Sequence, residues 1–258
     1  MYEDTFKLVR ADTPELKEAA FRLRHHVYCV EQPFEDPAKN STGMEIDEYD
    51  DHSVHTLLIH RKSGRLLGNV RIVLPDANAP LASFPMQHLT SLQQLNDEEH
   101  IRKSCEISRF CITKSARVGG NGRLPAGVFL DPSGNNSSLL SQHEQRIFPF
   151  AALGLIRAIF EMSLEHDIAL GYGLLEPHFI RLLKRQGIMA DILGPPVNYH
   201  GNRLPVELAP LKICHSVQQL YPELWKILTK NGALVNKIAA LAKRHQTAGS
   251  LLKLAMVH

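Results

Sequence analysis

Charged side chains gather in five short stretches of this sequence, and some of them interrupt apolar segments. Arg71 and Arg109 each lie inside an apolar segment typical of a strand, where a guanidinium needs a carboxylate partner or a polar cleft. Arg24 lies near the end of an expected helix, where a cation also suits the helix dipole. Asp47 and Asp50 belong to an acidic stretch that on its own is typical of a solvated loop.

These charges can balance one another. The three arginines can be matched by three acids, Asp47, Asp50 and Glu106. Such a network can be purely structural, or it can form a polar pocket for a zwitterionic amine whose carboxylate binds arginine and whose ammonium binds an acid. Strict strand alternation places Glu106 and Ser108 on one face of the sheet and Arg109 on the other, unless a bulge intervenes.

Hydrophobic periodicity predicts the elements that carry these residues. We expect strands at residues 5–10, 55–60, 66–74, 105–113, 168–175, 189–193 and 204–208. We expect helices at residues 14–30, 148–165 and 177–186, with one or two short helices within 76–100. The first helix begins at Thr13-Pro14 and is expected to carry Val30 on its apolar face. Runs of strands mixed with crossover helices predict a single three-layer α/β sheet that is partly antiparallel.

Composition indicates a folded domain. Of the 258 residues, 44% are hydrophobic and 22% are charged, which permits a sizeable core and argues against intrinsic disorder. The sequence shows no secretory signal and no run of about 18 apolar residues, so we expect a cytoplasmic protein. The four cysteines and 14 histidines show no metal-binding or redox spacing, so we expect buried thiols and no metal site.

The C-terminal segment is basic. Residues 224–258 hold six Lys or Arg and no acid. Leu234, Ile238 and Leu241 fall on one face of residues 233–244, which predicts a basic amphipathic helix. This helix can cap the domain, bind an acidic carrier protein or make a peripheral contact with an anionic inner-membrane surface. We expect a main domain at residues 1–212 and a basic helical extension at residues 213–258.

The charged stretches resemble the signature of the acyl-homoserine-lactone autoinducer synthases. That family shows Arg-x-x-x-Phe, a tryptophan six residues later, Glu-x-Asp-x-x-Asp, Gly-x-x-Arg-Leu-x-Pro and Glu-x-Ser-Arg-Phe. The corresponding residues here are Arg24, Tyr28, Phe34, Asp47, Asp50, Arg71, Glu106 and Arg109. The resemblance covers roughly residues 5 to 115 and continues more weakly to about residue 210. Phe34 in place of the tryptophan weakens the case for S-adenosylmethionine as the amine substrate.

Other features resemble a sister group. Cys29, His52-Ser53-x-His55 and His200-Gly-x-Arg203 look more like the acyltransferases associated with the PEP-CTERM/exosortase system, which are close to N-acyl amino acid synthases. We rank this subgroup first.

The resemblance implies a GNAT-like fold, with a V-shaped opening between two central strands that holds the phosphopantetheine arm of the donor. Glu106 looks like the general base, or the group that positions a water, and a partly shielded carboxylate with a raised pKa suits that task. Ser108 belongs to the same catalytic strand motif. The resemblance makes Arg109, with Asp47 and Asp50, part of the electrostatic cluster that shapes the substrate pocket.

The remaining implied roles concern the substrate-binding side. Arg24 and Tyr28 resemble residues that order an N-terminal lid, and Phe34, at the position of the family tryptophan, is expected to bind substrate. Arg71 resembles the strand arginine that pairs with the acids. The amine would attack a thioester directly, because the thiolate leaves easily and backbone N–H groups can hold the oxyanion. A nucleophilic role for Cys105 or Cys111 is therefore not needed.

Two further sets of residues bear on the donor. Arg117, Gly120 and Gly122 fit the GNAT pattern that cradles the pyrophosphate of coenzyme A, but prolines and a Ser-Gly-Asn-Asn run follow them instead of a helix. We therefore favour an irregular loop at residues 114–143 and acyl carrier protein over coenzyme A as donor. An exposed basic cluster is expected to contact that acidic carrier, namely Arg181, Lys184 and Arg185.

The leading prediction is an N-acyltransferase that moves a medium- or long-chain acyl group from a carrier thioester to an amino acid or similar amine, with no bound cofactor. The alternatives are an acyl-homoserine-lactone synthase that uses S-adenosylmethionine, an acyl-CoA-dependent acetyltransferase and a non-catalytic sensor of an acyl ligand. We expect a monomer and no nucleic-acid partner, because only the C-terminal segment is basic.

Overall fold

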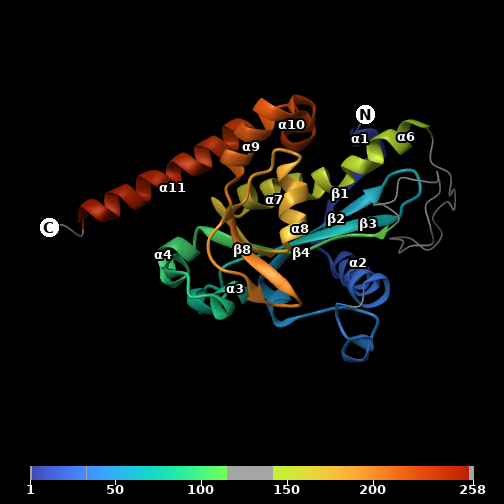
Figure 1. The fold of residues 1–258 in the computed structure, drawn as a ribbon, viewed down its shortest axis with the longest axis horizontal. Coiled ribbons are helices and arrows are strands. Elements are labelled where there is room, and N and C mark those ends of the chain that lie inside the picture. Colours follow the sequence, from blue (N-terminus) through green and yellow to red (C-terminus); the bar gives the residue numbers. More distant parts are fainter. Residues whose placement is uncertain (1, 33, 115–141, 256–258) are drawn as a thin grey trace. The chain divides into compact units, whose positions relative to one another are not determined.

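The structure, a computed structural model, describes residues 2–32, 34–114 and 142–255 (Figure 1). It divides into two compact units. Unit 1 comprises Met1–Ile72 and Ser108–Ile159, and unit 2 comprises Val73–Ile107 and Phe160–His258. The boundary predicted between residues 212 and 213 stays a prediction.

Unit 1 carries the first strands and the helices around them. Its helices are α1 (Tyr2–Thr5), α2 (Pro14–His25), a π-helix (His26–Glu31), α6 (Gln142–Ile147) and the first part of α7 (Ala151–Glu165). Its strands are β1 (Phe6–Arg10), β2 (Ser53–His60), β3 (Leu66–Val73) and the second half of β4 (Ser104–Ile112). β1 pairs antiparallel with β2, from Phe6 opposite His60 to Arg10 opposite Thr56.

Unit 2 begins with α3 (Pro85–Leu89), α4 (Glu98–Ile101) and the first half of β4. Its later strands are β5 (Leu170–Leu175), β6 (Asp191–Ile192), β7 (Val197–Asn198) and β8 (Asn202–Leu208). Its later helices are α8 (Pro177–Lys184), α9 (Pro210–Leu220), α10 (Pro222–Thr229) and α11 (Val235–Ala255). Short 3₁₀ helices in the two units span Pro37–Asn40, Glu48–His52, Pro80–Ala82, Gln93–Asn96 and Phe148–Phe150.

The described strands follow the order β1-β2-β3-β4-β5-β8-β6, and β7 pairs with β8. Strands β4 and β5 pair in parallel. Strands β5, β6 and β7 each pair antiparallel with β8. The predicted mixed, partly antiparallel α/β fold is therefore confirmed. Registered pairing between β4 and β5 runs from Ser104–Leu170 to Glu106–Tyr172. The V-shaped opening beyond that point stays a prediction.

The first helix positions Arg24 and then changes character. Thr13 caps α2 by accepting a hydrogen bond from the Leu16 N–H at 3.3 Å, and Pro14 occupies the first turn. The α-helix ends at His25 and continues as the π-helix, which advances fewer degrees per residue. Val30 is consequently 63% exposed, so its expected place on the apolar face is wrong.

Several short elements escaped sequence analysis. The helices α1, α6, α9 and α10 and the two-residue strand β7 were not expected. Helix α6 begins at Gln142, inside the irregular loop predicted at residues 114–143, and the helix predicted from residue 148 begins at Ala151 after a 3₁₀ turn. Helices α9, α10 and α11 follow one another at the C-terminal end of unit 2, in orange and red (Figure 1). Proline starts both α9 and α10, which fixes the first turn of each.

The amphipathic stripe of α11 is used for packing. Leu234, Ile238 and Leu241 are buried, and α11 lies against α9. The stripe therefore helps to complete the core of unit 2, as in the capping interpretation. Within the described residues, no helix is both long enough and apolar enough to cross a membrane.

Candidate functional site

Unit 1 contains a closed ring of alternating charges, which we call the charge network. Each arginine in it binds two acids, and each acid binds two arginines. The ring runs Arg24, Glu45, Arg109, Asp47, Arg71, Asp50 and back to Arg24. Asp47 and Asp50 pair with arginines as expected. The third carboxylate of the ring is Glu45, not Glu106, which the sequence had suggested.

Arg24 lies at the buried end of the network and is fully inaccessible to solvent. Its Nε donates to Glu45 Oε2 at 2.5 Å. Its two terminal nitrogens donate to the two Asp50 oxygens at 2.7 and 3.0 Å, a bidentate arrangement. A guanidinium buried this deeply is stable only because these two carboxylates compensate its lost hydration.

Arg71 joins the acidic loop to β4. Its Nη1 donates to Asp47 Oδ1 at 2.5 Å and to Asp50 Oδ1 at 2.8 Å, and its Nη2 donates to Asp47 Oδ2 at 3.0 Å. Its Nε donates to the Ser108 hydroxyl at 3.0 Å. The arginine predicted to find carboxylates in an apolar strand therefore does so.

Arg109 reaches the network through an unusual backbone conformation. Its φ is +48°, a left-handed value that is uncommon for a residue with a side chain. Its Nη2 donates to Glu45 Oε1 at 2.9 Å and to Asp47 Oδ2 at 2.7 Å. Ser108 also bonds the network, so two consecutive residues of β4 direct their side chains to the same side. The regular alternation of side chains along the strand is therefore interrupted at Arg109, as the sequence allowed.

The acids are held by their own loop. Asp47 caps the 3₁₀ helix Glu48–His52 by accepting from the Tyr49 N–H at 3.0 Å, and Asp50 accepts from the Asp47 N–H at 2.8 Å. This reciprocal capping box orients both carboxylates independently of the arginines. The Glu45 N–H donates to the Phe21 carbonyl at 3.1 Å, which ties the loop to α2.

The arginines dominate the electrostatics of the network. Burial raises the pKa of Glu45, but Arg109 and Arg24 outweigh that effect and hold the pKa at about 2. The pKa of Asp50 is likewise held below its usual value, against burial, by His55, Arg24 and Arg71. Burial lowers the pKa of His55, whose Nε2 lies 3.4 Å from Asp50 Oδ1. Sequence analysis assigned His55 no role beyond a subgroup marker.

Glu106 lies in unit 2, on the first half of β4, and is 2% exposed. Its Oε2 accepts a hydrogen bond from the Met86 N–H at 2.8 Å, in the first turn of α3. Its register partner on β5 is Tyr172, which is fully buried. The Tyr172 hydroxyl lies 2.5 Å from His100 Nε2 and donates to Glu207 Oε2 at 3.4 Å. Tyr172, His100 and Glu207 carried no sequence motif and were missed.

Known proteins resemble this chain in sequence. Residues 23–124 match the family model described as an acetyltransferase (GNAT) domain. An acyl-homoserine-lactone synthase of Vibrio anguillarum is 32% identical over 132 residues, which cover 50% of this chain and 63% of the synthase. The match thus spans less than two thirds of that relative.

Solved structures share the fold. The CoA-dependent acyl-homoserine lactone synthase BjaI, with MTA, gives a TM-score of 0.54 at 19% identity over 85% of this chain and 89% of its own. FeeM, an N-acyl amino acid synthase from uncultured soil microbes, gives 0.52 at 14% identity over 83% and 96%.

The chain has a GNAT-like fold and is related to the acyl-homoserine-lactone synthases. The predicted fold and this relationship are therefore confirmed, and the relatives are acyltransferases. The narrower association with the exosortase system stays a prediction.

The residues expected at the lid of this GNAT-like fold lie near the network in unit 1. The Arg109 guanidinium stands 6.0 Å from the centre of the Tyr28 ring, within cation–π range. Phe34 is 44% exposed, and its backbone N–H donates to the Tyr28 carbonyl at 2.9 Å. Phe34 is thus partly open to solvent.

The cysteines are all free and buried, as predicted. Burial raises the pKa of the Cys105 thiol, and raises that of Cys111 to about 12. Neither thiol is a thiolate near neutral pH, which agrees with a reaction that needs no covalent nucleophile.

Two groups of basic residues were expected to contact the donor, and the structure describes one of them. Arg181, Lys184 and Arg185 are exposed on or just after α8 in unit 2. Arg117, Gly120 and Gly122 lie outside the described residues.

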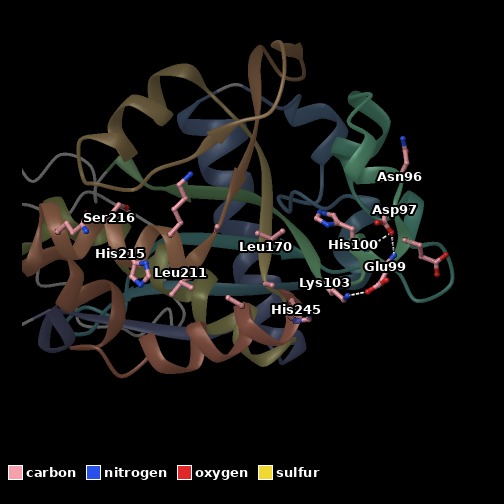
Figure 2. Close-up of a pocket in the computed structure, with 16 residues that line it drawn as sticks. Asn96, Asp97, Glu99, His100, Lys103, Leu170, Leu211, His215, Ser216 and His245 are labelled. Carbon is pink, nitrogen blue, oxygen red and sulfur yellow. Dashed lines mark hydrogen bonds and ion pairs between the residues drawn. The ribbon is translucent and has the colours of Figure 1, made fainter. Parts of the chain in front are cut away.

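Unit 2 also has an open hollow of about 1360 Å³. Figure 2 shows side chains from α4, β5, α9 and α11 around it, with His100 and Lys103 on one side and His215 and Ser216 on another. His100 therefore connects the buried Tyr172 hydroxyl with this hollow.

Proposed function

We propose that this protein is an N-acyltransferase that moves a medium- or long-chain fatty acyl group from a carrier thioester to the amine of an amino acid or similar small molecule. The observation that carries the proposal is Glu106, a buried carboxylate on a central strand of a GNAT-like fold, within the Glu-x-Ser-Arg-Phe motif. A carboxylate in such a place suits the removal of a proton from an attacking amine.

The other site residues have supporting roles in this proposal. Glu106 accepts the amine proton, directly or through a water, as nitrogen attacks the thioester carbon. Arg109, Asp47 and Asp50 keep the shape and charge of the substrate pocket, and Arg71 holds the acids in place. Arg24 and Tyr28 order the N-terminal segment, and Phe34 offers an apolar surface to the substrate. Collapse of the tetrahedral intermediate expels the thiolate, so no enzyme nucleophile is required.

The charge network supports a positioning role for its members. Its three guanidinium groups and three carboxylates already satisfy one another. A zwitterionic amine would have to displace one of these pairs to bind the network directly. We therefore propose that the network has a positioning role and does not bind the substrate amine directly.

A second candidate function is acyl-homoserine-lactone synthesis from S-adenosylmethionine. The observation that favours it is the 32% identity to the Vibrio anguillarum synthase. Phe34 in place of the family tryptophan favours the first candidate. Cys29, His55 and Arg203 resemble the exosortase-associated subgroup, and we extend the proposal to that subgroup.

The identity of the product distinguishes the candidates. The protein, its Glu106→Gln variant and a Glu99→Gln control are each expressed in a bacterial host, and lipid extracts are compared by mass spectrometry. Glu99 is a matched acid on α4, outside the proposed site. A new acylated amine with the intact protein and the control, but not with Glu106→Gln, supports N-acyl transfer. A lactone, with release of methylthioadenosine from purified components, supports the second candidate.

The donor is proposed to be acyl carrier protein, with acyl-CoA as the alternative. Among the described residues, Lys226, Lys230 and Arg244 form ion pairs with acids, whereas Arg181, Lys184 and Arg185 form none. The α8 cluster is therefore the better surface for an acidic carrier.

Charge reversal tests that surface. We expect Arg181→Glu with Lys184→Glu to raise KM for an acyl carrier substrate about tenfold and to leave KM for the matching acyl-CoA unchanged. The control reverses Lys226, an exposed lysine on α10 already paired with Glu223. Equal effects on both donors would point to a folding defect, and no effect on either would remove α8 from the carrier site.

A further inference from the structure

Arg109 has its left-handed backbone inside β4, where a residue with a β-carbon ordinarily adopts an extended conformation. Such a conformation costs free energy and persists only where neighbouring groups hold it. One such neighbour is Asn69 on β3, whose Nδ2 donates to the Arg109 carbonyl at 3.2 Å. Both residues belong to unit 1. Asn69 is therefore placed to stabilise the irregular backbone of Arg109.

The Asn69 side chain is fully buried in a strand that is apolar apart from Arg71. Because a carbonyl can only accept a hydrogen bond, the amide nitrogen of Asn69 must be the group that faces Arg109. Among the described residues, the amide oxygen of Asn69 has no hydrogen-bond partner. An unpaired polar atom at a buried position is unfavourable, and an aliphatic side chain of similar shape would avoid it. The donation to Arg109 is thus what an aliphatic residue could not provide.

Strand β3 lies unusually close to β4 next to Asn69. A β-carbon at Gly68 would lie 2.7 Å from the Cys111 carbonyl oxygen, which is closer than real side chains come. Glycine therefore permits a spacing of the two backbones that any side chain would prevent. This close approach brings the short Asn69 side chain within hydrogen-bond distance of the Arg109 carbonyl.

The backbone of Arg109 decides which acids its side chain reaches. Its Nε donates to both Glu45 oxygens at 3.1 Å, in addition to the bonds of Nη2 to Glu45 and Asp47. The Arg109 and Asp47 side chains are 13% and 21% exposed, whereas those of the other four network members are at most 4% exposed. A change in the Arg109 backbone would therefore alter the part of the network that faces solvent.

We propose that Asn69 is the positioning residue for Arg109. Its amide holds the carbonyl of the left-handed residue, and that conformation directs the guanidinium to Glu45 and Asp47. The inference rests on the proposed function in one respect, namely that Arg109 shapes the pocket for the amine. Asn69 acts through Arg109 and has no contact with the substrate in this proposal. It occupies an unspecified position of the Gly-x-x-Arg motif.

Nitrogen-15 NMR of the arginine side chains tests the positioning without any turnover. Asn69→Leu fills the site more tightly and Asn69→Ala leaves a space, so an effect common to both variants reports the lost donor. We expect the Arg109 Nε–H to exchange with solvent about five- to tenfold faster in both, which corresponds to one lost hydrogen bond. The Arg24 Nε–H is expected to keep its exchange rate, because Asp50 holds that guanidinium independently.

Kinetics measure the consequence for the amine, with the amine that mass spectrometry of the product identifies. We expect both variants to raise KM for the amine about five- to tenfold, while kcat and KM for the thioester change by less than about twofold. A general packing defect would instead reduce the amount of active enzyme, so kcat would fall and neither KM would change.

Asn40→Ala is the matched control. Asn40 also donates its side-chain amide to a backbone carbonyl, that of Asp36 at 3.0 Å, but it lies on an exposed turn outside the charge network. This variant is expected to leave both the exchange of the Arg109 Nε–H and KM for the amine unchanged. Effects equal to those of the Asn69 variants would contradict a specific role for Asn69.

The two measurements separate this inference from the proposed function. Unchanged exchange of the Arg109 Nε–H in both Asn69 variants would overturn the positioning role, whether or not the chain transfers acyl groups. Faster exchange in a chain that makes no acylated amine would remove the proposed function and leave Asn69 as the residue that positions Arg109. Faster exchange in an active enzyme with an unchanged KM for the amine would overturn the connection between Asn69 and the pocket.

Discussion

The charge network in unit 1 and the polar side chains Glu106, Tyr172 and His100 in unit 2 have contrasting surroundings. In the network every arginine faces two carboxylates and every carboxylate faces two arginines, so the charges are locked against one another. In unit 2, Glu106 accepts a hydrogen bond from the Met86 N–H, and the Tyr172 hydroxyl bonds His100, which lines an open hollow. The network therefore fixes shape, whereas Glu106 is proposed to accept a proton.

The largest effect that sharpens this contrast is expected at Glu106. Glu106→Gln removes the proton acceptor but keeps an oxygen that can accept from the Met86 N–H. We expect kcat to fall by about 10²–10⁴-fold while the free energy of unfolding changes by less than about 1 kcal/mol. Steady-state rates and urea unfolding on the same preparation measure both quantities. A large loss of stability would place Glu106 with the structural groups.

The network should respond in the opposite way. Arg24→Met leaves Glu45 and Asp50 buried with half of their compensation, so we expect the free energy of unfolding to fall by about 3–5 kcal/mol. Arg22→Met on the same helix breaks an exposed pair with Glu18 and should cost about 0.3–0.5 kcal/mol. Similar losses for the two variants, measured by denaturant unfolding, would contradict a structural role for the network.

Acid should weaken the network in a predictable window. The folded pKa of Glu45 is about 2, below the ordinary value of 4.5, so its contribution to stability is complete above about pH 5 and disappears as pH falls toward 2. The shift corresponds to about 3 kcal/mol. Unfolding free energy measured from pH 6 to 2 should fall by about that much more in the intact protein than in Glu45→Gln. Parallel curves would show that Glu45 does not contribute.

The sequence carried the local features of both regions. Arginines in apolar strands signalled buried ion pairs, and Thr13-Pro14 predicted the start of α2, because both follow from the cost of burial and from capping chemistry. The motif around Glu106 likewise located the strand that holds it. The mixed sheet followed from hydrophobic periods and crossover helices.

The sequence alone did not predict which acids pair with which arginines, or how residues on neighbouring strands align. Either Glu45 or Glu106 could have paired with an arginine, and the left-handed backbone at Arg109 decided which acids it reached. The placement of Glu106, Tyr172 and Glu207 opposite one another on neighbouring strands depends on strand register, which no single segment encodes. The exposure of Val30 followed from a π-helix that the hydrophobic period did not reveal.

Ser108 gives the smallest and most discriminating test, because it lies two residues after Glu106 on β4 but bonds Arg71 of the network. If it acts through the network, Ser108→Ala should lower the free energy of unfolding by about 1–2 kcal/mol, since the Arg71 Nε loses its acceptor, and kcat should change by less than about threefold. Ser108→Thr keeps the hydroxyl and should recover most of that stability. A fall in kcat near that of Glu106→Gln, with stability intact, would move Ser108 from the network to the catalytic group. The boundary between shape and chemistry would then lie between Ser108 and Arg109, where the backbone departs from regular strand geometry.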